Sequence, residues 1–527
     1  MILFALVLCF CHASDLSKNR LKTVKSLLTT TVDSSGAFML LNNNEMIGAY
    51  SKKGVVRGKC HRLNAQEEVN GWSSGEETEV VVVIPDNILN AKNLELFGSK
   101  KVVGVVAYKS EGNITSQDKQ TSFNPDGDNS AWKLWDFPIF YTTASVDYFA
   151  SEGSHLQIEA AMNSDVNSET CLRRGMCKPI GGQTLYGKLD NTTRSKKILL
   201  TAQLDGVSLF RETTPANEQV LSGEVTLLSV MQTLKPLMKK SNISVEFALF
   251  EDETFGHMGS RLFSSTNDSY DAIYNFGHLG LTEGKVYVYT QHDIPTVERL
   301  EKVTLTPPES PLDSFKNGVK YHFADHLEVY KGKVGTHRDV IEKIEELCDN
   351  VKTISRVLME TLFETNYETF EKDNTVEYNC SIFDELYSCF AEDMTCEYFN
   401  ETIGVIKGNG NSYSSIYGDE RITARSKALS DYLKYIVTLN HCEGDCEVNN
   451  GTVQYLPTHG SDIDTDKNQI RGNSGDAWTE SDWKTLRLSF YKTRKLSDII
   501  MCVVGVVTTM AFITASFVLL FKGKYFE

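Results

Sequence analysis

The sequence predicts an α/β protein with a large lobe, built on a mixed and mainly parallel sheet flanked by helices. A smaller strand-rich lobe precedes it and one membrane-spanning helix follows it. Three features predict this arrangement. Apolar runs of strand length alternate with amphipathic helical stretches in the second part of the chain, short β-rich runs come before them, and about 20 apolar residues stand near the C-terminus. The length of 527 residues also favours two lobes, because a single hydrophobic core rarely grows so large.

The composition indicates a folded, acidic protein. Hydrophobic residues make up 41% of the chain, charged residues 23%, and the formal net charge is −17. This negative net charge argues against nucleic-acid binding, which depends on basic surface.

The two ends of the chain predict passage through the secretory pathway. Residues 1–13 form an apolar run that closes on the small pair Ala13-Ser14, which is typical of a cleaved signal peptide. Residues 499–521 are apolar apart from small polar side chains, and such a run matches the thickness of a bilayer. Lysines flank the run on both sides, so the signal peptide decides the orientation: we expect an outside N-terminus and a cytoplasmic tail of residues 522–527.

Glycosylation sequons support the same orientation. Asn-x-Ser/Thr motifs are spread over the whole region before the predicted span, as a lumenal or extracellular face would show. They begin at Asn113, Asn191, Asn242, Asn267, Asn379, Asn400 and Asn450.

The cysteines between the two ends lie in a compartment where thiols normally pair. Their number is odd, so we expect one free thiol. Proximity favours the pairs Cys171–Cys177 and Cys442–Cys446, with a further bond from the group at 380, 389 and 396, although connectivity does not follow from sequence. Disulfides are also the better interpretation than a zinc ribbon, since no paired Cys doublets occur.

Residues 14–166 are expected to form the small lobe. The runs 80–84 and 102–108 are continuous β-branched stretches bounded by turn residues, which predicts strands. An aromatic cluster at 132–140 is interpreted as core or as a contact between lobes.

Residues 167–490 are expected to form the large lobe. Strands are predicted at 198–202, 245–250 and 286–289, and the helical spacing of apolar residues in 221–237 predicts the crossover helix of a βαβ unit. A second amphipathic helix is predicted over 336–365. Residues 366–483 show weak periodicity and support no prediction.

Polar residues follow the predicted strands, where open α/β sheets collect functional groups. The segment 203–205 follows the first of these strands, 215–218 precedes the helix, and 252–260 follows the next strand. This arrangement resembles the fold of the secreted zinc aminopeptidases, which also underlies the transferrin receptor ectodomain.

The resemblance implies a metal site whose ligands this chain has largely lost. The family's ligand and base positions correspond to Gln203, Glu218, Glu253, Thr254 and Gly277. An amide, a hydroxyl and a bare glycine cannot replace the donors that zinc needs, so we expect no catalytic metal and no cofactor. The histidines His257, His278, His322 and His326 could rebuild a site in principle, but scattered histidines are more often ordinary surface or core groups.

Two interpretations of the surviving carboxylate stay open. Glu253 could pair with the ammonium of a peptide's amino terminus. It could instead, with Asp252, cap or pair with neighbouring loop groups. No nucleophile elbow follows a strand, so catalysis is not expected. On the first interpretation Glu253 is a candidate substrate-binding residue.

From about residue 130 to the C-terminus the chain resembles the nicastrin family, the large glycoprotein subunits of γ-secretase. The resemblance is carried by the stretches 136–140, 171–174, 202–205 with Phe210, Pro215-Ala216 with Glu218, Phe250 with 253–255, 258–260, and 478–481 with Trp483. The last stretch is the most specific, because it has no counterpart in soluble aminopeptidases.

The resemblance implies a subunit without catalytic activity that supports assembly and screens type I membrane substrates by their ectodomains. Presenilin performs the hydrolysis in that complex, and the other small membrane subunits are further partners. The implied locations are the endoplasmic reticulum, Golgi, plasma membrane and endosomes. The resemblance also associates Glu253 and the segment that follows it with contact to a substrate amino terminus, so the candidate substrate-binding residues are Glu253, Thr254, Gly259 and Ser260. Gly256-His257 replaces the family's common Asp-Tyr pair, so a role tied to those side chains does not transfer.

Small residues recur along the predicted span, at Gly505, Thr508, Ala511 and Ala515. Such a face lets a neighbouring helix approach closely, although a lipid-exposed helix is the alternative. At the level of function, the alternatives are an active membrane-anchored zinc exopeptidase and a transferrin-receptor-like binding ectodomain, the latter expected to carry its span near the N-terminus.

Overall fold

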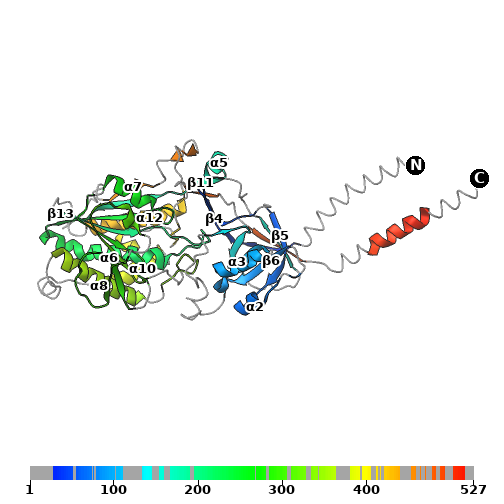
Figure 1. The fold of residues 1–527 in the computed structure, drawn as a ribbon, viewed down its shortest axis with the longest axis horizontal. Helices are drawn as coiled ribbons and strands as arrows, with labels where there is room; N and C mark the ends of the chain where they lie inside the picture. The colour runs from blue at the N-terminus through cyan, green and yellow to red at the C-terminus, as the bar shows by residue number, and fades with distance from the viewer. Residues whose placement is uncertain are drawn as a thin grey trace, which may run out of the picture.

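The computed structural model describes most of the chain (Figure 1). It describes all residues except 1–27, 52–54, 74, 76–78, 101, 111–132, 145–153, 160–166, 190–194, 268, 281–283, 306–309, 328–333, 342–343, 364–379, 392–393, 405–410, 414–415, 417–419, 439–452, 459–462, 465–468, 471–477, 482–486, 493–502 and 517–527.

The large lobe is built on an eight-stranded mixed sheet with the order β17-β16-β18-β15-β13-β14-β12-β19. Its centre is parallel, because β18, β15, β13 and β14 run in one direction, whereas at one edge β12 runs antiparallel to β14 and β19 runs antiparallel to β12. The strands are β12 (Gln183–Lys188), β13 (Lys196–Gln203), β14 (Ile243–Phe250), β15 (Ala272–Phe276), β16 (Val286–Tyr289), β17 (Leu300–Val303), β18 (Val319–Ala324) and β19 (Val453–Pro457).

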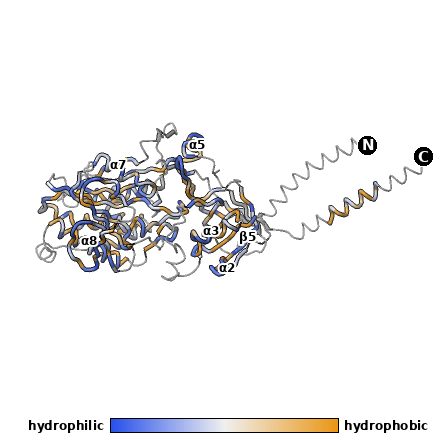
Figure 2. The backbone as a smooth tube through the Cα atoms, viewed as in Figure 1, coloured by the Kyte–Doolittle hydropathy of each residue, from blue (hydrophilic) through white to orange (hydrophobic). Residues whose placement is uncertain are grey.

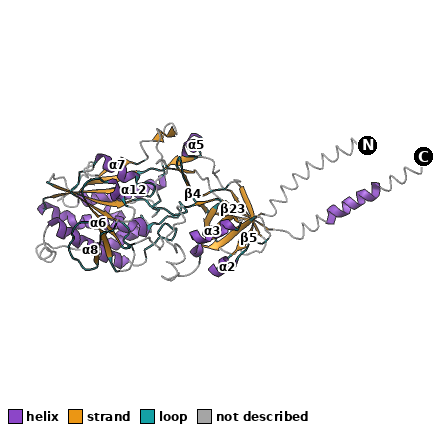
Figure 3. Cartoon of the chain, in the orientation of Figure 1, coloured by secondary structure: helices purple, strands orange, loops and turns teal. Residues whose placement is uncertain are grey.

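Helices cover both faces of this sheet (Figure 3). Alternate residues of β13 point to opposite faces: Leu200 joins the larger core cluster with α6, α8, α10 and α12, and Leu199 joins a smaller one with α7. The helices are η4 (Asn217–Leu221), α6 (Ser222–Leu234), η5 (Lys235–Lys240), α7 (Met258–Thr266), η6 (Pro311–Ser314), α8 (Ile344–Phe363), α10 (Cys380–Ala391), α11 (Glu397–Thr402) and α12 (Glu420–Thr438).

The predicted βαβ unit is β13, α6 and β14. The two strands pair in parallel with Ile198 opposite Val245, and α6 crosses between them with Val225, Leu228 and Met231 fully buried. The helical stretch is a regular α-helix only in its middle. The π-helical turn η4 precedes α6, and the 3-10 helix η5, which contains Pro236, follows it.

The second amphipathic helix is shorter than predicted. We expected it to begin near residue 336, but α8 begins at Ile344. The residues before it are used elsewhere: the Asp339 carboxylate accepts hydrogen bonds from the backbone amides of Glu218 (2.8 Å) and Gln219 (3.2 Å) at the start of η4. The helical spacing of apolar residues in this segment therefore reflects burial against several elements, and it does not mark one continuous helix.

The small lobe contains a second eight-stranded sheet, ordered β1-β23-β10-β5-β6-β7-β9-β2, and a five-stranded sheet, ordered β11-β22-β3-β4-β8. Strands β5, β6, β7 and β9 are parallel, and α3 packs on one face of them through Leu94 and Phe97. The elements are β1 (Leu28–Asp33), β2 (Ser35–Gly36), β3 (Met39–Leu41), β4 (Met46–Ala49), β5 (Val55–Arg62), α2 (Gln66–Gly71), β6 (Val80–Pro85), η1 (Asp86–Ile88), α3 (Ala91–Ser99), β7 (Val102–Tyr108), β8 (Leu134–Trp135), β9 (Ile139–Thr142), β10 (Ser154–Glu159), α5 (Ser168–Arg173), β11 (Cys177–Pro179), β22 (Thr479–Ser481) and β23 (Arg487–Lys492). A short hairpin pairs β20 (Ile463–Asp464) with β21 (Gln469–Ile470).

The chain returns to the small lobe after completing the large one. Strand β23 lies between β1 and β10, and β22 lies between β11 and β3. Strands from beyond residue 166 therefore pair with strands before it. The lobe boundaries at residues 166 and 490, which describe the order of the lobes along the chain, stay a prediction.

The two lobes share a hydrophobic core. Val207, Leu209 and Phe210, which follow β13, join the cluster that contains the apolar face of the small-lobe sheet. The Phe210 ring lies 5.5 Å from that of Tyr141, between ring centroids, and the Phe255 ring lies 6.0 Å from that of Trp478.

A buried ionic cluster crosses the same interface. Asp86 of the small lobe is fully buried and accepts from Arg338 Nε at 2.8 Å, and its Oδ2 lies 3.1 Å from His337 Nε2. The backbone amide and hydroxyl of Ser110 also donate to Asp86, at 3.0 and 2.7 Å. Burial alone would raise the pKa of Asp86, but the contacts with His337 and Arg338 lower it to about 2, so the carboxylate stays ionised.

Disulfides join Cys171 to Cys177 and Cys389 to Cys396, and Cys348 is also disulfide-bonded. The predicted pair Cys442 and Cys446 lies outside the described residues. Cys60 is a free thiol, and burial raises its pKa to about 12.

No helix within the described part of the chain combines the length and the apolar character needed to cross a bilayer. Of the predicted span 499–521, residues 503–516 are described, and they form an exposed apolar helix apart from the two lobes (Figure 2).

The cluster at Asp86 leads to a first prediction. Replacing Asp86 with Ala removes the partner of a partly buried guanidinium, and we expect a loss of roughly 3 kcal/mol in stability at the lobe interface. Hydrogen exchange of the Ser110 amide should report it as lost protection. Glu95→Ala, which breaks a surface pair with Lys133, is the matched control and should cost about 0–1 kcal/mol. Equal losses of stability from the two changes would contradict the role of Asp86 in stabilising the lobe interface.

Candidate functional site

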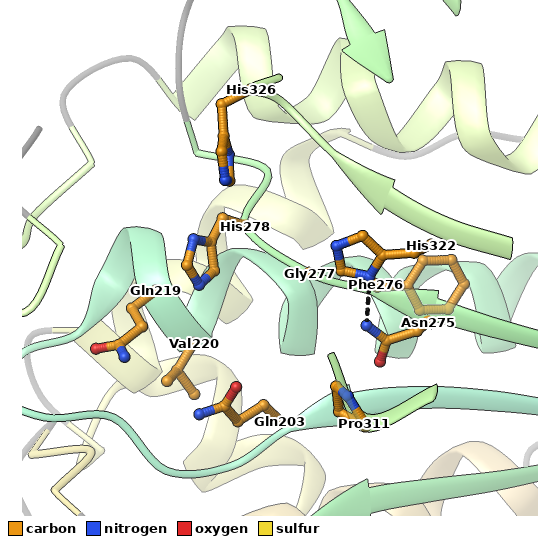
Figure 4. A pocket seen from close by; sticks show the side chains of 10 residues that line it. All are labelled: Gln203, Gln219, Val220, Asn275, Phe276, Gly277, His278, Pro311, His322 and His326. Carbon is orange, nitrogen blue, oxygen red and sulfur yellow. Dashed lines mark hydrogen bonds between the residues drawn. The ribbon is translucent and has the colours of Figure 1, made fainter. Parts of the chain in front are cut away.

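A small polar pocket lies where the parallel strands of the large lobe end (Figure 4). Strands β13, β15 and β18 bring their carboxyl ends together there, and the segment at η4 and residue 311 complete the wall. Its volume is about 40 Å³, which is space for about three water molecules. The described residues that line it are Gln203, Gln219, Val220, Asn275, Phe276, Gly277, His278, Pro311, His322 and His326.

A chain of hydrogen bonds fixes the orientation of His322. Thr201 Oγ1 donates to Asn275 Oδ1 at 2.9 Å, and Asn275 Nδ2 lies 2.8 Å from His322 Nδ1. Because the amide nitrogen donates, Nδ1 of the imidazole accepts and the ring proton sits on Nε2. The N–H of His322 Nε2 therefore points into the pocket (Figure 4).

The other two imidazoles stack on each other. The rings of His278 and His326 lie 5.4 Å apart between centroids, and His326 Nδ1 lies 3.0 Å from the buried carboxylate of Asp325. Burial, followed by the neighbouring imidazoles, lowers the pKa of both His278 and His322 to about 3. At neutral and mildly acidic pH these two rings are therefore uncharged.

The side-chain amide of Gln203 bonds to the protein through its nitrogen and faces the pocket with its oxygen (Figure 4). Its Nε2 donates to Thr254 Oγ1 at 2.9 Å and to the backbone carbonyl of Asp205. The Oε1 atom turns toward His278 and the pocket interior (Figure 4). Gln203 thus offers an acceptor to whatever occupies the pocket.

The absence of a side chain at Gly277 creates part of the space. A Cβ at this position would lie 2.6 Å from His322 Cε1 and 3.1 Å from its Nε2. A side chain at this position would clash with His322. The His322 imidazole therefore occupies the space beside residue 277.

Glu253 is not among the residues that line this pocket. Both oxygens of its carboxylate already have hydrogen-bond partners in the segment that follows it. Its Oε1 accepts from the Ser260 amide at 2.6 Å, and its Oε2 accepts from Ser260 Oγ at 2.9 Å and lies 3.0 Å from His257 Nδ1. Only 2% of Glu253 is exposed. Burial raises its pKa, against the opposing effect of His257. The carboxylate orders the first turn of α7.

The start of α7 needs its small residues. A Cβ on Gly259 would lie 2.2 Å from the Glu251 carbonyl oxygen, so only glycine fits, and His257 adopts a left-handed conformation (φ 53°) directly before the helix. Ser260 is fully buried and its hydroxyl also lies 2.8 Å from Ser314 Oγ.

Asp205 holds the neighbouring loop. Its carboxylate accepts from the amides of Glu253 (2.8 Å) and Thr254 (3.1 Å) and is fully buried. Asp252 beside it accepts from Thr458 Oγ1 and the Gly182 amide. Burial, together with the charges of Glu251 and Asp205, raises the pKa of Asp252 well above its usual range.

The structure thus divides the predicted site residues into two groups. Gln203 and Gly277 line the pocket with His278, His322 and His326, whereas Glu253, Thr254, Gly259 and Ser260 lie outside this lining, just before α7 and in its first turn. Glu218 is buried at the start of η4. Sequence reasoning missed Asn275 and Gln219 as lining residues. Within the residues that the structure describes, no group of three or more His, Cys, Asp and Glu side chains is arranged to hold a metal ion.

Three of the seven predicted sequons fall on described residues. Asn242 and Asn400 are exposed, and Asn267 is half-buried with its Nδ2 donating to the Phe263 carbonyl. The other four, at 113, 191, 379 and 450, lie outside the described residues.

Comparison with known proteins gives a consistent answer. Residues 196–275 match a family model described as the nicastrin large lobe. A curated nicastrin from Dictyostelium purpureum is 23% identical, and the match covers 89% of each chain. The chain is related to the nicastrins. A nicastrin from Arabidopsis thaliana is 22% identical over 66% of each chain. A crystal structure titled as the γ-secretase component nicastrin has the same fold, with a TM-score of 0.67, 21% identity, and coverage of 88% of this chain and all of that one.

A second prediction concerns Glu253. Glu253→Gln should destabilise the α7 segment by roughly 1–3 kcal/mol, because an amide cannot accept from Ser260 and His257 with both of its polar atoms. Thermal unfolding measures this effect, with Glu301→Gln in an exposed pair as the control. An unchanged stability together with weakened binding of a peptide amino terminus would instead favour a substrate contact.

A third prediction follows from the buried imidazoles. The pKa of His322 is below its unfolded value, so the unfolded state binds more protons between these values, and folding stability falls as the pH drops below 6.5. His322→Gln should flatten the decline of stability between pH 6.5 and 4.5 by roughly 1–2 kcal/mol. Unfolding midpoints across this range test it. His292→Gln, at an exposed position, should leave the profile unchanged.

Proposed function

We propose that this protein is the large ectodomain subunit of a γ-secretase, supporting assembly of the complex and screening type I membrane substrates without cleaving them. The observation that carries the proposal is the relationship to the nicastrins over nearly the whole of both chains. Presenilin and the other small membrane subunits are its proposed partners, and hydrolysis belongs to presenilin.

The chemistry of the pocket supports a role without catalysis. Peptide hydrolysis by a metallopeptidase needs a bound metal and a base aimed at the water that the metal activates. Gln203, Thr254 and Gly277 offer an amide, a hydroxyl and no side chain where the aminopeptidase pattern has ligands, and the base position, Glu253, is saturated by Ser260 and His257. The alternative, an active membrane-anchored zinc exopeptidase, is therefore disfavoured.

The proposed setting is a single-pass membrane protein with its two lobes in the lumen or outside the cell. The apolar signal segment, the sequons and the apolar run at 499–521 support this topology. The compartments proposed from the relationship are the endoplasmic reticulum, Golgi, plasma membrane and endosomes.

Substrate contact by the α7 segment stays a proposal with a specific constraint. The amino terminus of a substrate would have to replace one of the donors that Glu253 already accepts from, since the carboxylate is buried and occupied. Screening by the size and shape of the ectodomain does not require that exchange.

The proposal is tested by affinity purification of the tagged full-length chain from gently solubilised membranes. We expect presenilin and the small membrane subunits in stoichiometric amounts, with no bound zinc, by mass spectrometry and metal analysis. One zinc per chain without presenilin would overturn it.

The same purification tests the predicted packing face of the span. Gly505→Leu places a large side chain on the face of small residues, and we expect recovery of the partner subunits to fall at least several-fold. Val506→Leu changes the neighbouring face and is the matched control. Equal recovery with both variants would show that the small residues carry no packing role.

A further inference from the structure

The pocket described above has a chemical character that points to its ligand. Its described lining contains no Asp, Glu, Lys or Arg. The two histidines with shifted pKa values, His278 and His322, are held uncharged at neutral pH. An ion entering such a pocket would lose its hydration without gaining a counter-charge from these residues, which is costly.

The pocket also offers both a hydrogen-bond donor and a hydrogen-bond acceptor. His322 Nε2–H is a donor, because Asn275 occupies Nδ1, and Gln203 Oε1 is an acceptor, because its Nε2 is used by Thr254. Both atoms face the same space (Figure 4). A ligand that satisfies both must itself carry an acceptor and a donor.

The size restricts the ligand further. A volume of about 40 Å³ accepts a group of three or four heavy atoms and not a folded segment or an aromatic ring. Val220 and Pro311 give the lining an aliphatic part. A planar group of this size, with one C=O and one N–H, fits the description.

We propose that this pocket binds an amide group of a peptide, either the carboxamide of an Asn or Gln side chain or a backbone peptide group. The proposal rests on the proposed role of this lobe in contacting peptide substrates. It assigns the contact to the pocket between β13, β15 and β18, and makes the bound group uncharged and not the amino terminus.

The test uses the full-length chain in detergent and four capped tripeptide probes, compared by saturation-transfer NMR at pH 7. Two probes carry amides only: acetyl-Gly-Asn-Gly-amide and acetyl-Gly-Gly-Gly-amide. The other two are acetyl-Gly-Asp-Gly-amide and the Asn peptide with a free amino terminus and a methylated side-chain amide. Binding by a single small group is expected on the order of 1–10 mM.

We expect the Asn probe, the triglycine probe or both to bind, and the stronger of the two identifies the source of the amide. The Asp probe should bind no better than triglycine, because the carboxylate adds nothing. Gly277→Ala should weaken amide binding at least tenfold, because its Cβ would crowd His322. Gly71→Ala, where a Cβ meets nothing within 4 Å, is the matched control and should bind as the parent chain does.

A second variant separates a loss of amide binding from a loss of folding. His278→Phe keeps a ring to stack on His326 and removes the nitrogens, and its unfolding temperature is measured beside its affinity. Stronger binding of the Asp or free-amine probe, unchanged binding to Gly277→Ala, or no binding of any amide at 20-fold above the expected range would overturn the proposal. Partner recovery with Gly277→Ala is measured separately, so the pocket and the subunit role can fail independently.

Discussion

The architecture depends on how the chain leaves strand β13. Directly after the strand, Asp205 accepts the amides of Glu253 and Thr254, which ties this loop to the end of β14. Arg425 of α12 donates to the Leu204 carbonyl at 2.9 Å and to the buried Glu224 of α6. A few residues later Phe210 enters the core shared with the small lobe. One loop therefore sets the pocket wall, the α7 segment and the lobe contact together.

The strand ends around the pocket are held together by hydrogen bonds between uncharged side chains. In a metal site the ion holds loops from several strands together. Here hydrogen bonds hold the loops instead, because Gln203 bridges to Thr254, and Asn275 fixes His322 above Gly277. These neutral polar contacts keep the strand ends in register.

The sequence predicted the parts of the fold whose signal is local. The strand β7 was predicted with its observed ends, 102–108, and β16 likewise, because continuous β-branched and aromatic runs mark buried strands. The pocket could not be predicted fully, since His322 meets Asn275 only through the parallel pairing of β15 with β18. Likewise Asp86 and His337 are 251 residues apart, and no short-range pattern marks such a pair. The helix start at 344 was missed because tertiary contacts of Asp339 override a periodic pattern.

The position of β23 has a consequence for how the protein is made. The strand lies between β1 and β10, so the small-lobe sheet is divided until the ribosome has synthesised the chain beyond residue 487. The lobe that begins first is thus finished last, after the whole large lobe has emerged. During that interval β1 and β10 present unpaired edges, which invite association with other chains. A quality-control system that recognises open sheet edges would therefore detect any chain truncated before its last strand.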